Sequence, residues 1–129
     1  MTKVAQKTNF YTFLIKAENL LRTRLDNYWC DILDKPELLD LICAQSADAV
    51  EMMLRDCGLN FVRITYKTTK IKRMDTQINL IALKDDKPMR LNDLLYAKVP
   101  DETFNKLEDW FNEFKPSMSS KGGSSDGSN

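Results

Sequence analysis

The hydrophobic pattern of this chain changes its period at Gly58, and no other feature constrains the fold as strongly. Before Gly58, apolar residues recur at steps of three and four, which places them on one face of a helix. After it, Val62, Ile64 and Tyr66 alternate with polar residues, a pattern typical of a strand with one solvated face. The sequence therefore predicts an α+β fold with a helical amino-terminal half followed by a small antiparallel sheet.

The first predicted element is one long amphipathic helix over residues 9–33. Thr8 or Asn9 can cap its first amides, and no glycine or proline interrupts it. Pro36 then stops the helix, because the residue before a proline is displaced from helical geometry. The apolar face consists of Phe10, Phe13, Leu14, Ala17, Leu21, Leu25, Tyr28, Trp29 and Ile32.

Two shorter helices are predicted next. Pro36 suits the first position of a second helix of about two or three turns. Ser46 is a natural cap for a third helix, which Gly58 would end as a left-handed residue.

The second half of the chain is predicted to form a hairpin and a final helix. The apolar run 78–83 can pair antiparallel with the strand that begins at Val62, and residues 89–91 can add a short strand. Asn92 can cap a turn of helix through Tyr96, and Pro100 can open an amphipathic helix. The core-facing stripe of that helix is predicted to be Phe104, Leu107, Trp110 or Phe111, and Phe114. Residues 1–115 are predicted to be one globular domain, and the serine- and glycine-rich residues 116–129 a disordered tail.

The composition limits the kinds of chemistry that we expect. The chain has no histidine, and Gly58 is its only glycine before the tail, so Ser-His or Cys-His pairs and glycine-rich phosphate loops cannot form. Asp85 and Asp86 are adjacent acids, but Lys87 and Pro88 after them indicate a turn. We expect no enzymatic activity, cofactor, metal site or small-molecule substrate. No apolar run approaches the roughly 20 residues of a membrane span, so we also expect no membrane association.

The three cysteines indicate a reducing environment. Cys30, Cys43 and Cys57 are an odd number without a close pair, and each lies in a helical pattern where a free thiol acts as a small apolar side chain.

Charge is distributed unevenly along a chain whose formal net charge is zero. Residues 26–57 contain eight acidic residues against two basic ones, and the last predicted helix is again acidic. The stretch RITYKTTKIKRM, residues 63–74, contains five basic residues and no acid. These five are the candidate partner-binding residues: Arg63, Lys67, Lys70, Lys72 and Arg73.

Two kinds of binding fit this charge pattern. Complementary potentials steer proteins toward partners, so acidic helices and a basic hairpin favour a protein partner with both kinds of surface. The alternative is nucleic-acid binding by the basic hairpin 63–73, for which Tyr66 and the preceding Phe61 are the only nearby rings. Any single charge is also explained by solubility alone, so only the clusters support a functional interpretation.

Three stretches of the chain resemble a known family. KTNFYTFLIKAENLLRTRL, NYWCDILDKPELLDLICAQ and CGLNFVRITYK are similar to the small RNA polymerase-binding proteins of T-even-type bacteriophages. The resemblance concerns length and overall sequence rather than a short motif, so it transfers no functional residues. It implies a non-enzymatic phage protein that binds host core RNA polymerase in the bacterial cytoplasm and modulates transcription. Indirect or weak nucleic-acid contact is also compatible with the basic stretch.

Overall fold

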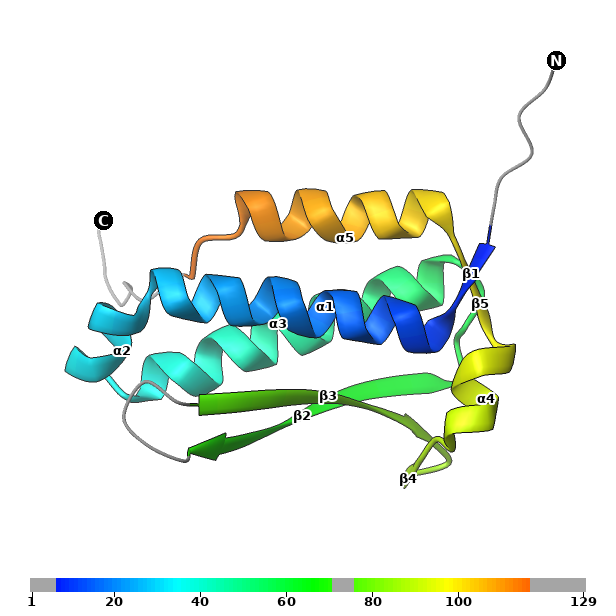
Figure 1. Ribbon diagram of the computed structural model, residues 1–129, viewed down its shortest axis with the longest axis horizontal. Coiled ribbons are helices and arrows are strands. Elements are labelled where there is room, and N and C mark those ends of the chain that lie inside the picture. Colours follow the sequence, from blue (N-terminus) through cyan, green and yellow to red (C-terminus); the bar gives the residue numbers. More distant parts are fainter. Residues whose placement is uncertain (1–6, 71–75, 117–129) are drawn as a thin grey trace, which may run out of the picture.

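The helices and the hairpin form three layers in the computed structural model, which describes residues 7–70 and 76–116 (Figure 1). Helices α1 (Phe10–Asn27) and α3 (Glu37–Asp56) make the middle layer. Helix α5 (Asp101–Glu113) covers one side of it, and strands β2 (Val62–Lys70) and β3 (Thr76–Lys84) cover the other. In this layering α3 lies against β2 and α1 against β3. The predicted α+β class is confirmed.

The prediction of one helix over residues 9–33 is wrong, because the chain turns at Tyr28. Helix α1 ends at Asn27, and a separate helix α2 (Trp29–Asp34) follows. Asn9 caps α1 as expected, since its side-chain oxygen accepts a hydrogen bond from the Thr12 amide at 2.8 Å. The turn lets Trp29 and Ile32 reach the core beside α3. Hydrophobic spacing continues across Tyr28, so periodicity cannot detect this change of direction.

The prediction of two helices between Pro36 and Gly58 is also wrong, because α3 runs unbroken through Ser46. The Ser46 side chain is fully buried, and its hydroxyl donates to the Ile42 carbonyl oxygen at 2.7 Å. A serine hydroxyl that bonds the carbonyl four residues back lies inside a helix, so it does not mark the start of a new helix. Ser46 therefore satisfies its hydroxyl inside the helix instead of capping a terminus.

Gly58 ends α3 in a left-handed conformation, as predicted, with a φ of 101°. The Leu59 amide donates to the Leu54 carbonyl at 2.8 Å, and the Gly58 amide donates to the Arg55 carbonyl at 3.1 Å. These two bonds are the Schellman motif, which satisfies carbonyls that the helix end would leave free. The chain then turns directly into β2.

Strands β2 and β3 pair antiparallel from Val62 opposite Lys84 to Lys70 opposite Thr76. A two-residue turn follows at Asp85 and Asp86, whose φ values of 54° and 64° are those of a type I′ hairpin. This turn confirms the turn chemistry expected for the acidic pair. The third strand is β4 (Lys87–Pro88), earlier than the predicted 89–91, because the tight turn restarts pairing at once.

A short strand pair that was not predicted joins the two ends of the fold. Strand β1 (Lys7–Asn9) pairs antiparallel with β5 (Lys98–Pro100), and the Phe10 amide donates to the Ala97 carbonyl at 2.8 Å. Helix α4 (Leu91–Tyr96) precedes β5 and begins just after Arg90, slightly before the predicted cap at Asn92. The pair fixes where α1 and α5 begin relative to one another.

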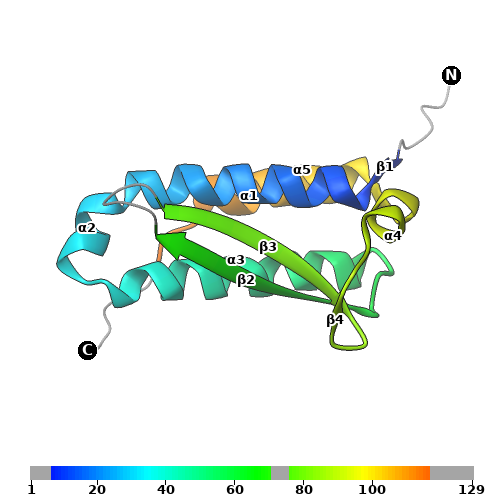
Figure 2. The same cartoon turned by 60° about the horizontal axis from the view of Figure 1, so that its bottom comes forward.

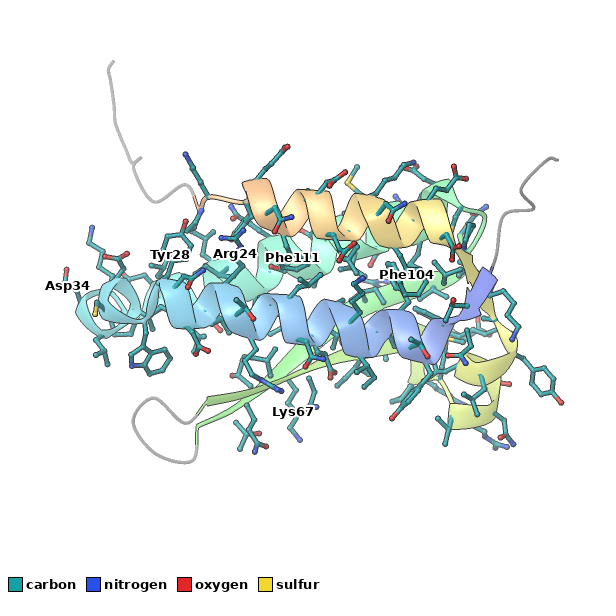
Figure 3. All side chains as sticks on the ribbon, turned by 45° about the horizontal axis from the view of Figure 1, so that its top comes forward. Arg24, Tyr28, Asp34, Lys67, Phe104 and Phe111 are labelled. Atoms are coloured by element: carbon teal, nitrogen blue, oxygen red, sulfur yellow. The ribbon has the colours of Figure 1, made fainter. Side chains whose placement is uncertain are left out.

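Helix α5 begins at Asp101, directly after Pro100 as predicted, and packs aromatic residues toward α1 (Figure 3). Phe111 rather than Trp110 is the buried member of the predicted stripe, together with Leu107 and Phe114. Phe104 is half-buried and meets Phe13 edge-on, with ring centroids 5.1 Å apart. Apart from Pro116, the predicted tail lies outside the described residues. Across the described helices, none is long and apolar enough to cross a membrane.

Candidate interaction surfaces

The hairpin presents one face to the helices and the other to solvent (Figure 2). We call the second face the outer sheet face. Its side chains are exposed or half-buried, and none is acidic. It comprises Arg63, Thr65, Lys67 and Thr69 of β2, and Gln77, Asn79, Ile81 and Leu83 of β3. Alternation along each strand, as read from the sequence, is what places these residues together.

The structure places two of the five candidate basic residues on this face. Arg63 and Lys67 are exposed there, and Lys67 projects away from the helices (Figure 3). Lys70 is the last residue of β2, but its side chain is outside the described part of the chain. Lys72 and Arg73 also lie outside the described residues. The candidate site therefore rests on Arg63 and Lys67.

Arg63 is partly neutralised by the hairpin turn. Its guanidinium Nη1 lies 3.7 Å from Asp86 Oδ1, and both side chains are largely exposed. An ion pair in water at this distance contributes little to stability and leaves the arginine able to exchange partners. Lys67 lies directly opposite Asn79, so its charge is not opposed across the strands.

The free edges of the hairpin are held by two glutamates that the sequence did not indicate. Glu18 of α1 accepts a hydrogen bond from the Leu80 amide at 2.8 Å, and Glu51 of α3 accepts one from the Ile64 amide at 2.8 Å. We call these bonds the edge clamps. Each ties a helix to a strand edge and occupies an amide that could otherwise pair with another chain. Glu18 is 62 residues from Leu80, so no local pattern could have revealed its clamp.

The presence of Arg63 and Lys67 also has a structural explanation, which is protection of the exposed edge of β2. Exposed strand edges in natural proteins carry charged side chains that discourage pairing with other chains. Arg63 and Lys67 lie on β2, an edge strand with no second neighbour among the described residues. Protection of this edge and recognition of a partner can both be served by the same two side chains.

The aromatic residues near the basic strand do not form a stacking platform. Tyr66 faces α3, where burial, Asp40 and Cys43 raise its pKa above the ordinary value. Phe61 is 47% exposed, but the Lys84 ammonium lies 5.2 Å from its ring centroid. The outer sheet face therefore lacks the free rings on which single-stranded nucleic acids stack.

The acidic residues gather on the helices, and α5 lies on the opposite side of the middle layer from the hairpin (Figure 1). Helices α3 and α5 each contain five acidic residues and one basic residue. One of these acids, Glu108, pairs with Lys16 of α1 at 3.0 Å. The basic outer sheet face and the acidic α5 thus point in opposite directions.

An apolar patch covers the start of α1 and the adjoining α4, which contact each other. Tyr96 is 81% exposed, and none of the six residues of α4 is buried. The exposed members of the patch are Tyr11 and Ile15 of α1 and Leu91, Leu95 and Tyr96 of α4. Leu91, Leu94 and Leu95 have the spacing of a single buried helix face, so the sequence carries no signal that α4 is exposed.

The thiols and carboxylates do not converge. Within the described residues, no group of three or more Cys, Asp or Glu side chains is placed to hold a metal ion. Burial, with a smaller effect of Asp40, raises the pKa of the Cys43 thiol to about 12, which makes it a poor nucleophile.

Comparisons of the chain with protein-family models, curated proteins and solved structures each give no match. The geometry of the surfaces and the resemblance described above are therefore the basis for a functional proposal.

Proposed function

We propose that this is a non-enzymatic phage protein that binds host bacterial core RNA polymerase in the host cytoplasm and modulates transcription. The observation that carries the proposal is the separation of charge between the outer sheet face and α5, on opposite sides of the molecule. The resemblance to the T-even-type polymerase-binding proteins supplies the identity of the partner.

A large enzyme that acts on nucleic acid is a suitable partner for a small protein with two oppositely charged faces. Polymerases present basic surfaces where they contact nucleic acid and acidic surfaces elsewhere, so a small protein with both signs can be oriented on encounter. The apolar patch on α1 and α4 adds area that can be desolvated, and desolvated area contributes more to affinity than exposed ion pairs do.

The test is co-migration of the purified chain with bacterial core RNA polymerase on size exclusion at micromolar concentration and low salt. The double variant Arg63→Glu with Lys67→Glu is expected to bind polymerase more weakly, with an affinity that depends less on salt. Arg22→Glu with Lys35→Glu is the matched control, since both side chains are exposed and neither lies on the hairpin or on α5. Clean separation of wild-type protein from polymerase would overturn the proposal.

The second candidate is nucleic-acid binding by the basic hairpin 63–73. It is favoured by the absence of acids on the outer sheet face, where Arg63, Lys67, Gln77 and Asn79 can donate hydrogen bonds to phosphates. Binding should weaken steeply with salt and be lost in the Arg63→Glu, Lys67→Glu variant. A mobility shift unaffected by that double substitution would remove the hairpin from consideration.

A further inference from the structure

A hollow of about 210 Å³ lies between α3 and α5, away from the outer sheet face. Ala49, Met52, Met53 and Asp56 of α3 line it on one side, and Trp110 of α5 on the other. We call this hollow the α3–α5 groove. An apolar cavity of about 150 Å³ is enough to hold a benzene ring, so the groove has room for one bulky side chain.

One wall of the groove is rigid and the other is adaptable. The Trp110 ring stacks on Phe114 with centroids 4.7 Å apart and meets Phe111 edge-on at 4.9 Å, so its position is fixed by the core. Met52 is 60% exposed, whereas Met53 beside it is buried. An exposed methionine next to a fixed indole is suited to binding, because the flexible thioether can fit ligands of different shape.

The two helices that form the groove are acidic, with five acidic residues each. Asp56 lines the groove, and the exposed Asp48 and Asp109 are the chain neighbours of Ala49 and Trp110. The two basic residues of these helices do not cancel this charge. Arg55 is bound to Glu51 at 3.1 Å, and Lys106 is one basic residue against five acidic residues on α5.

We propose that the α3–α5 groove binds a basic amphipathic helix of a partner protein. One bulky apolar residue of that helix inserts between Met52 and Trp110, and lysines or arginines on its flanks meet Asp48, Asp56 and Asp109. This arrangement is the helix-in-groove mode of recognition, with charge selecting the partner. A nucleic acid would be repelled by the same acidic helices. The proposal goes beyond polymerase binding, because it concerns an apolar groove between α3 and α5, does not depend on the outer sheet face, and is tested without polymerase.

The test uses a fluorescently labelled 18-residue peptide of lysine and leucine arranged with helical periodicity, and a scrambled peptide of the same composition. Anisotropy titrations at low salt should show that the wild-type protein binds the amphipathic peptide at least tenfold more tightly than the scrambled one. Met52→Arg should weaken binding at least tenfold. Leu33→Arg is the matched control, because Leu33 is 57% exposed on α2 and does not line the groove.

Two further measurements keep the outcome decisive. Asp56→Asn with Asp109→Asn should lower both the affinity and its dependence on salt, while circular dichroism reports that each variant is folded. If Met52→Arg does not fold, Met52→Ala replaces it, with an expected weakening of about threefold, as the loss of part of one apolar contact implies. Equal binding of the scrambled peptide, or a Met52 variant that binds like wild type, would overturn the proposal. Dimerisation of the wild-type protein on size exclusion that Met52→Arg abolishes would also overturn it, since it would identify a second copy of the chain as the occupant.

Discussion

The edge clamp between Glu18 and Leu80 can be tested by removing the carboxylate. In Glu18→Ala, the Leu80 amide loses the oxygen that accepts its hydrogen bond at 2.8 Å. Hydrogen bonds to charged groups contribute about 1.5–3 kcal/mol, and a half-buried carboxylate that water can partly replace belongs at the low end. We therefore expect the free energy of unfolding to fall by about 1–2 kcal/mol. Glu18→Gln keeps a neutral acceptor and should lose about half as much.

Glu108→Ala is the control for this experiment. Glu108 is also a helical glutamate, and its carboxylate makes a 3.0 Å salt bridge to Lys16 in which both side chains are more than one-third exposed. An exposed pair contributes at most about 1 kcal/mol and commonly less. Because both changes replace glutamate by alanine in a helix, the gain in helix propensity is the same in each and cancels in the comparison.

Urea unfolding followed by circular dichroism measures the stability of each variant, and amide hydrogen exchange locates the effect. Exchange of the Leu80 amide should accelerate in Glu18→Ala more than exchange of the Ile64 amide, which Glu51 still holds. The reasoning would be refuted if Glu18→Ala cost no more than Glu108→Ala, or if the Leu80 amide kept its wild-type exchange rate.

Three further predictions concern the helix end, the hairpin turn and a buried thiol. Gly58→Ala should lower the free energy of unfolding by about 1–2 kcal/mol in urea, because its φ of 101° is unfavourable for a residue with a Cβ; an unchanged stability would contradict this. Asp86→Gly should raise the free energy of unfolding by about 0.5 kcal/mol, and with it the melting temperature, because glycine adopts a φ of 64° freely and the lost ion pair is exposed. The folded protein keeps the Cys43 proton up to about pH 12, whereas the unfolded chain releases it near the ordinary pKa of 9.0. The protonated Cys43 thiol therefore makes its full contribution to the free energy of unfolding below pH 9, and this contribution is lost as the pH rises toward 12. In urea titrations at alkaline pH, the free energy of unfolding should fall less for Cys43→Ala than for wild type.

Most elements of the fold were predictable because they depend on local patterns. The alternation after Gly58, the proline before α5 and the apolar spacing of α1 each reflect the geometry of a single element. The errors arose where a local signal had two solutions. Ser46 can cap a helix or bond within one, and apolar spacing across Tyr28 suits both a straight helix and a turned one. At Tyr28, packing of α2 against α3 selects the turned arrangement.

The candidate surfaces were predictable only in part, for the same reason. Counting charges along the chain identified the basic stretch, and strand alternation then placed Arg63 and Lys67 on one face. The edge clamps and the α3–α5 groove depend on residues far apart in the sequence, whose proximity is created by the layering of the helices.

The sequence by itself determined the class of fold, the end of α3 at Gly58, the turn at Asp85 and Asp86, and the uneven distribution of charge, because each depends on backbone preference or composition within a few residues. The tertiary structure alone decided which faces became surface. Burial of Phe111 leaves Trp110 beside Met52, and the contacts of α1 and α3 with the hairpin leave only its outer face open. Exposure is a property of the packed whole, since the same apolar side chain is core or contact surface according to what lies over it.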